Sequence, residues 1–153
     1  MHICRTRLAS QPALAGIKHC NRLEQILARA ECDEAGTDEG LMLDVDGNAI
    51  SATAGNLFVL QGVHWYTPSV DLCGIAGVCR QHLLPLLDAR EKRLSMHDLQ
   101  IADAVFLCNA VRGILPVARI GELEWAPHPE VTRARQALAR IHPGFAHSGM
   151  ESA

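Results

Sequence analysis

The sequence lacks any long apolar run and any block of basic residues, and aromatic side chains make up only 4% of its 153 residues. The longest apolar stretches, such as residues 83–87 and 104–108, fall far short of the ~20 residues that a membrane-spanning helix needs. Acidic residues outnumber basic ones by 17 to 14, for a formal net charge of -3, so there is no electrostatic footprint for nucleic acid. The sequence therefore predicts no membrane and no nucleic-acid partner. Residues 1–20 also lack the apolar centre of a secretory signal, and we expect a cytoplasmic location.

Paired cysteines and metal-ligand spacings are missing as well. The six cysteines include no Cys-x-x-Cys pair, and the eight histidines show no His-x-His or His-x-x-x-His spacing. A zinc site is typically built from such clusters, so no metal is expected, and the thiols are predicted to be free and mostly buried. Lysine is scarce too. Lys18 and Lys92 stand against twelve arginines, so each lysine merits separate inspection.

What the sequence does contain is a series of short apolar patterns separated by turn residues, which is typical of one compact domain. We therefore expect residues 1–153 to form a single domain. In residues 21–30 the apolar side chains recur at helical spacing, which predicts an amphipathic helix just after Lys18. The residues that form its apolar face are Leu23, Ile26, Leu27 and Ala30.

The next part of the chain is typical of an antiparallel strand meander. Asp46-Gly47 predicts a hairpin turn, because such turns require positive φ angles, and Gln61-Gly62 predicts a second reversal. The expected strands are residues 41–44, a partner from residue 49, and residues 56–60, 63–67, 104–108 and 114–120. The expected later helices are a Pro85-containing segment around residues 83–87, a short one over 96–101 and a surface helix over 131–141, followed by a loose tail over 143–153.

Two local patterns are candidates for chemistry. Lys18 lies between a glycine-containing loop and a helix, where it is either a nucleophilic amine or a solvated lysine at a helix entry. Gly74 and Gly77 precede a helix, where backbone N–H groups and the helix dipole bind phosphate in some proteins, although close packing also explains such glycines. The residues alone leave both alternatives open.

The segment at residues 15–29, which contains Lys18, closely resembles the lysine-bearing segment of aminodeoxychorismate lyases. These enzymes belong to the fold type IV pyridoxal-phosphate enzymes. Further segments match in the family's order over roughly residues 4 to 120, and several well-spaced motifs make coincidence an unattractive explanation. They are residues 39–44, 56–58, 66–68, 73–81, 102–110 and 114–117.

The resemblance implies an α/β fold, with a mostly antiparallel sheet curled into a pseudo-barrel and packed helices, as in the family's large C-terminal domain. It also implies pyridoxal 5'-phosphate as cofactor and Lys18 as the catalytic residue, which binds the cofactor aldehyde covalently and later shuttles the substrate proton. The remaining cofactor-binding residues that it implies are Ser51, Gly77, Val78, Cys79, Asn109 and Ala110. Gly77 to Cys79 match the turn that cradles the phosphate, and Asn109 with Ala110 match a second loop that faces phosphate and substrate.

Ser51 departs from the family pattern, because the family has a glutamate there that pairs with the pyridine nitrogen. A hydroxyl offers only a neutral hydrogen bond. We therefore expect Ser51 to weaken transamination more than an elimination that gains aromaticity. The family's smaller N-terminal domain has no counterpart in this sequence, so we expect either a homodimer or a missing N-terminal domain as partner, and poor activity of the chain alone.

The implied reaction converts 4-amino-4-deoxychorismate into 4-aminobenzoate, a folate precursor, and pyruvate. A D-amino-acid or branched-chain aminotransferase of the same fold type is the first alternative. A catalytically inactive remnant or interaction module is the second.

Overall fold

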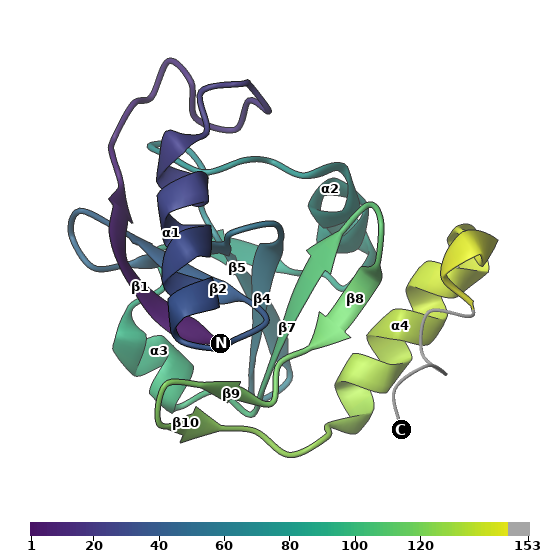
Figure 1. Ribbon diagram of the computed structural model, residues 1–153. Helices are drawn as coiled ribbons and strands as arrows, with labels where there is room; N and C mark the ends of the chain where they lie inside the picture. Colours follow the sequence, from purple (N-terminus) through teal and green to yellow (C-terminus); the bar gives the residue numbers. More distant parts are fainter. Residues whose placement is uncertain (147–153) are drawn as a thin grey trace.

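The computed structural model describes residues 1–146 and contains one large mixed sheet flanked by helices (Figure 1). The sheet has eight strands, in which β1 to β6 pair in sequence order and β7 joins β4 to β8. The strands are β1 (His2–Leu8), β2 (Gly40–Asp44), β3 (Ala49–Ala52), β4 (Asn56–Gln61), β5 (His64–Pro68), β6 (Arg90–Lys92), β7 (Ala104–Asn109) and β8 (Gly113–Pro116). A small separate hairpin contains β9 (Arg119–Ile120) and β10 (Leu123–Glu124).

Most strand pairs are antiparallel, as expected. Only β1–β2 and β5–β6 are parallel, and the β2–β3 hairpin turns at Gly47, whose φ of +85° suits glycine. Strand β4 is the centre of the sheet, because β3 and β5 pair along one of its edges and β7 pairs along the other. The α/β class with a mostly antiparallel sheet is confirmed, although the strand pairing does not close into a barrel.

Within residues 1–146, four α-helices and one 3-10 helix accompany the sheet. Their bounds are α1 (Leu23–Glu34), α2 (Val78–Leu86), α3 (Met96–Gln100), α4 (Pro129–Ile141) and the 3-10 helix η1 (Pro143–Phe145). Side chains alternate across strand β4, so that Leu57 and Val59 join one core cluster, while Phe58 and Leu60 join another. Helices α2 and α4 pack on the Phe58 side, and Leu99 of α3 packs on the Leu57 side. None of these helices is long and apolar enough to cross a bilayer.

Several predicted elements need correction. The predicted strand over residues 114–120 is two strands, β8 and β9, and the strands β1, β6 and β10 were not anticipated. At the start of the predicted loose tail over 143–153, residues 143–145 form η1, and Phe145 packs against the core cluster that contains Phe58. The rest of that tail, residues 147–153, lies outside the described residues.

The prediction that the thiols are free and mostly buried is confirmed. All six cysteines are free, and all except Cys20 are buried.

Candidate active site

The loop that carries Lys18 is tied directly to the glycine turn before α2. The Gly16 N–H donates to the carbonyl of Gly74 at 3.0 Å, and the Ala76 N–H donates to the carbonyl of Gly16 at 3.0 Å. Gly16 and Gly74 both have positive φ angles, +77° and +86°, so glycine suits both positions. The two candidate patterns of the sequence thus lie side by side, in the loops at the top of Figure 1.

Lys18 follows this bridge by two residues, and its side chain is exposed. Across residues 1–146, no side chain or backbone group forms a hydrogen bond or ion pair with the Lys18 amine. By contrast, the amine of Lys92 binds Asp98 at 2.8 Å and Gln61 at 3.0 Å. Lys18 is therefore the lysine whose amine is available to a ligand, and Lys92 is held in place by structural contacts.

The N-terminus of α2 lies directly after the glycine turn. Gly77 is its N-cap residue, no side chain caps the helix, and its first turn contains no acidic residue. The first backbone N–H groups of a helix have no partner within it, and they carry the positive end of the helix dipole. The N–H groups of Val78 and Cys79 are thus suited to a phosphate group.

Asn56, on β4, shapes this turn. Its side-chain amide donates to the carbonyl of Ile75 at 2.7 Å, and a Cβ added to Gly77 would come within 2.3 Å of the Asn56 Oδ1. Any other residue at position 77 would therefore displace Asn56 or the turn itself. No local sequence signal predicts this role of Asn56, because it depends on a contact with Ile75, which is distant in the chain.

Ser51 is buried on β3, directly opposite Asn56 on the neighbouring strand. Directly paired residues of antiparallel strands project to the same face of the sheet, so Ser51 and Asn56 share the face toward the glycine turn. Ser51 is thus connected to the glycine turn through its strand partner Asn56. It supplies a neutral hydroxyl where a carboxylate would supply a charge.

Asn109 and Ala110 lie where β7 turns into β8. The side-chain amide of Asn109 donates to the carbonyl of Ala54 at 3.1 Å, and its oxygen accepts from the N–H groups of Val111 and Arg112 at 3.0 and 2.8 Å. The Asn109 side chain is thus engaged in shaping the β3–β4 and β7–β8 turns. Ala110 is exposed.

Strand pairing connects this turn to the rest of the site. Asn56 pairs with Cys108, the neighbour of Asn109, across β4 and β7. Cys79 and Cys108 belong to the same core cluster, so the first turn of α2 also packs near the end of β7, and the neighbouring Cys108 lowers the pKa of the Cys79 thiol.

Two arginines, neither of them among the predicted site residues, position the surrounding elements. The guanidinium of Arg22, which precedes α1, donates to the carbonyl of Thr53 at 3.2 Å and so joins the end of the lysine loop to the end of β3. Arg80, in the first turn of α2, is buried and donates to the carbonyl of Pro68 at 2.8 Å. It also forms an ion pair of 2.8 Å with Glu91. No local sequence signal indicates these contacts, because each one joins residues distant in the chain.

The residues present fit a phosphate-bearing aldehyde. The uncapped helix start suits a phosphate, the glycine at position 77 lets Asn56 pack against the turn, and Lys18 has an amine with no partner among residues 1–146 that could react with a carbonyl group. The partner of a ring nitrogen would be the hydroxyl of Ser51. Within residues 1–146, no group of three or more histidine, cysteine, aspartate or glutamate side chains is arranged to hold a metal ion.

Comparisons with known proteins point in the same direction. The family model described as amino-transferase class IV matches residues 1–120. Aminodeoxychorismate lyase from Vibrio harveyi is 38% identical over 127 residues, which cover 80% of this chain and 47% of that protein.

Two solved structures show the same likeness. The 4-amino-4-deoxychorismate lyase of Pseudomonas aeruginosa is 41% identical, with a TM-score of 0.88 over 93% of this chain and 54% of that chain. The branched-chain amino acid aminotransferase of Escherichia coli is 25% identical, with a TM-score of 0.85 over 94% of this chain and 52% of that chain.

This chain spans about half the length of the relatives that it matches. The family match covers most of the chain, and it includes the lysine loop, the glycine turn and the start of α2. The chain therefore belongs to the class IV aminotransferase family.

Proposed function

We propose that this chain is the cofactor-binding part of a pyridoxal-phosphate-dependent lyase that converts 4-amino-4-deoxychorismate into 4-aminobenzoate and pyruvate. The observation that carries the proposal is the pair of hydrogen bonds that join Gly16 to Gly74 and Ala76, because they hold the Lys18 loop beside the uncapped start of α2. The higher identity to the two lyases, 38% and 41%, than to the aminotransferase, 25%, favours the lyase reaction.

Each residue of the site has a distinct task in this proposal. The N–H groups of Val78 and Cys79 bind the phosphate and fix the cofactor in one orientation. When bound, pyridoxal phosphate supplies an electron sink next to the bond that breaks. Lys18 Nζ first holds the cofactor aldehyde, then accepts the ring proton of the substrate and afterwards donates a proton as an acid.

Ser51 favours elimination over transamination in this site. A neutral hydroxyl does not keep a ring nitrogen protonated as a carboxylate does, so the electron sink is weaker. Loss of the enolpyruvyl group gains the aromaticity of 4-aminobenzoate, whereas transamination has no such gain. The weaker sink therefore costs the lyase reaction less than it costs an aminotransferase.

An aminotransferase of the same fold type, acting on branched-chain or D-amino acids, is the second candidate. The likeness to the Escherichia coli branched-chain enzyme, with a TM-score of 0.85, favours it. An inactive remnant is the third reading, and Ser51 is the feature that favours it.

The exposed face of α1 supports a polypeptide partner for the active form. Leu23, Ile26 and Leu27 are 62%, 64% and 50% exposed, and Ile17 in the lysine loop adds a further 53% exposed side chain. Such a contiguous apolar patch typically marks an interface. We propose that a second copy of the chain, or the half of the relatives' length that this chain does not span, covers this patch and completes the substrate cleft.

The first experiment tests attachment of the cofactor. Added pyridoxal phosphate is expected to give an absorption band near the visible edge, and borohydride reduction followed by peptide mapping is expected to place the label on Lys18. Lys18→Arg is expected to abolish both signals. The matched control is Lys92→Arg, which changes the only other lysine and keeps its charge beside Asp98. A label on Lys92, or none on either lysine, contradicts the proposal.

The second experiment separates the reactions. Pyruvate release from 4-amino-4-deoxychorismate is compared with turnover of amino-acid and keto-acid pairs, both for this chain alone and for this chain mixed with the half of a relative that it does not span. Turnover of amino acids without pyruvate release favours the aminotransferase. If Lys18 is labelled but neither activity is found, the result favours the inactive remnant.

A third experiment tests Ser51. Ser51→Glu is expected to increase transamination more than lyase activity. Unchanged cofactor absorption and turnover in this variant would refute the role given to Ser51.

A further inference from the structure

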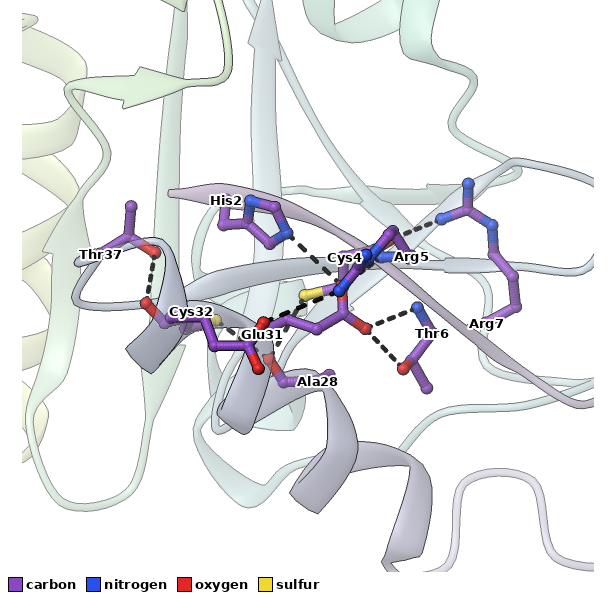
Figure 2. Close-up of polar contacts among 10 residues, drawn as sticks. His2, Cys4, Arg5, Thr6, Arg7, Ala28, Glu31, Cys32 and Thr37 are labelled. Atoms are coloured by element: carbon purple, nitrogen blue, oxygen red, sulfur yellow. Dashed lines mark hydrogen bonds and ion pairs between the residues drawn. The ribbon is translucent and has the colours of Figure 1, made fainter.

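Two cysteines meet beneath helix α1, and neither is among the residues assigned to the cofactor. Cys4 on β1 and Cys32 on α1 are both 0% exposed and belong to the same core cluster. Their sulfurs approach the same carbonyl oxygen, that of Ala28, at 3.8 and 3.2 Å (Figure 2). The thiols therefore share one small site.

Gly40 on β2 shows how closely the two sulfurs are packed. A Cβ added there would lie 2.5 Å from the sulfur of Cys4 and 2.6 Å from the sulfur of Cys32. Both sulfurs thus border the same point in space, and only glycine leaves that point free. Burial, followed by the neighbouring Cys32, raises the pKa of the Cys4 thiol to about 12, which agrees with two thiols in contact.

We propose that Cys4 and Cys32 form a reversible disulfide, with a low-molecular-weight disulfide such as oxidised glutathione as the oxidant. A thiolate of the pair attacks one sulfur of the small disulfide, forms a mixed disulfide and releases one small thiolate. The second protein thiolate attacks the protein sulfur of that mixed disulfide, closes the S–S bond and releases the other small thiolate. The two thiol protons end on the released small thiols, and two electrons pass from the protein to the oxidant.

The way α1 is attached gives the oxidant a route to these buried sulfurs. The only buried residues of α1 are Ala28 and Cys32, and both are small. An element with few buried apolar contacts opens locally at a lower free energy than the core of the domain. Lifting of α1 from the sheet therefore exposes Cys32 without unfolding the rest of the chain.

A disulfide between Cys4 and Cys32 would enclose the loop that contains Lys18. Strand β1 ends at Leu8 and helix α1 begins at Leu23, so the bond from Cys4 to Cys32 encloses the entire loop that carries Lys18. A covalent link restricts the open states in which α1 leaves β1. Oxidation thus links β1 covalently to α1, the two elements that flank the loop containing Lys18.

The test uses the full chain with Cys20→Ser, because Cys20 is the exposed thiol and would form mixed disulfides. After treatment with oxidised glutathione, free thiols are blocked and the remaining five cysteines are counted under denaturing conditions. We expect loss of two thiols, a mass lower by two hydrogen atoms and full reversal by a reductant. Cleavage after arginine and glutamate is expected to release residues 1–5 linked to residues 32–34.

Matched variants and a second readout keep the test decisive. In the same background Cys4→Ser is expected to lose the link, whereas Cys79→Ser, which breaks the other thiol pair, is expected to keep it. Native trypsin cleavage after Lys18 is expected to slow several-fold on oxidation. Any of three results would overturn the proposed site: five unchanged thiols, mixed disulfides alone, or a link between Cys79 and Cys108. These results are measured without the Cys4→Ser variant, so they remain decisive if that variant fails to fold. Unchanged cleavage in the linked protein would overturn its effect on the lysine loop.

Discussion

Helices α1 and α4 lie on the same sheet, and both have apolar side chains at helical spacing, but they bury different parts of themselves. Helix α4 buries Val131, Ala134 and Leu138 in the core cluster that contains Phe58. Helix α1 buries only Ala28 and Cys32 and exposes its larger apolar side chains. Helix α4 thus buries apolar side chains in the core of this chain, whereas the larger apolar side chains of α1 are exposed.

The attachment of α1 to the sheet is correspondingly polar. Glu31 accepts hydrogen bonds from the N–H groups of Arg5 and Thr6 at 2.6 and 2.9 Å, and from the Thr6 hydroxyl at 2.6 Å (Figure 2). It also lies 3.4 Å from His2. The Glu31 carboxylate therefore ties α1 to β1 by several hydrogen bonds, whereas α4 is held by aliphatic packing.

The largest expected effect is on the α4 side of this comparison. Leu138 is 1% exposed, and Leu138→Ala is expected to lower the free energy of unfolding by about 2–5 kcal/mol, because it leaves a cavity in the core. The matched change in α1, Leu23→Ala, is expected to cost less than about 0.5 kcal/mol. Urea unfolding of both variants measures the difference. Equal losses of unfolding free energy would contradict the view that α4 buries its apolar face and α1 does not.

A polar substitution probes α1 itself. Glu31→Gln is expected to lower the free energy of unfolding by about 1.5–3 kcal/mol, because charge-assisted hydrogen bonds to β1 are lost. Glu34→Gln is the control, since Glu34 is exposed and its ion pair with Arg5 spans 3.8 Å. If Glu31→Gln and Glu34→Gln lower the free energy of unfolding by the same amount, the hydrogen bonds of Glu31 do not stabilise the contact between α1 and β1.

The same carboxylate predicts a pH dependence. Burial opposes its charge, but hydrogen bonds from Thr6 and Arg5 outweigh that effect and lower the pKa of Glu31 from 4.5 to about 2. A carboxylate with a lowered folded-state pKa stabilises the fold above its unfolded pKa, and that contribution is lost as the pH falls toward the folded value. Stability should thus decline between about pH 5 and pH 2, and Glu31→Gln should flatten this decline in acid titrations followed by circular dichroism.

The two helices also show what the sequence revealed and what it did not. Helical spacing correctly predicted that both helices exist, because periodicity is a local property. It did not reveal that Leu23, Ile26 and Leu27 face outward, since periodicity identifies an apolar face but not the surface that covers it. Strand β1 escaped prediction because exposed Arg5 and buried Cys4 and Leu8 give no clear apolar run, and its pairing with β2 comes from far along the chain.

Some residues of the candidate site could be identified from the sequence, and others only from the structure. Lys18 and the Gly74–Gly77 turn could be singled out from sequence, and the structure brings them together. The roles of Asn56 and Arg80 could not be derived, because each depends on long-range contacts with a turn or strand. Local patterns thus identify candidate ligand-binding groups, whereas the residues that position those groups emerge only from the fold.

Gly40 offers a sharper probe of the thiol contact under α1. Gly40→Ala is expected to cost about 1–3 kcal/mol of unfolding free energy, because the new methyl group overlaps both sulfurs and overpacks the cluster. Gly144→Ala is the control, since no atom lies within 4 Å of the added Cβ. Thermal unfolding compares the two, and a neutral Gly40→Ala would mean that α1 moves away from the sheet at little cost.

The smallest effect on folding is expected on the exposed face of α1. Replacing Leu23 and Ile26 together by serine should change the free energy of unfolding by no more than about 0.5 kcal/mol, because both side chains already contact water. If this face binds a second copy of the chain, sedimentation at increasing concentration should show weaker self-association of the double variant. Exposed Val63 and Val111, replaced by serine in a control, lie on turns away from α1 and should leave association unchanged. Unaltered association of the double variant would mean that the apolar surface of α1 is not where two copies meet, and the contrast with α4 would then have to be explained by a partner of another kind.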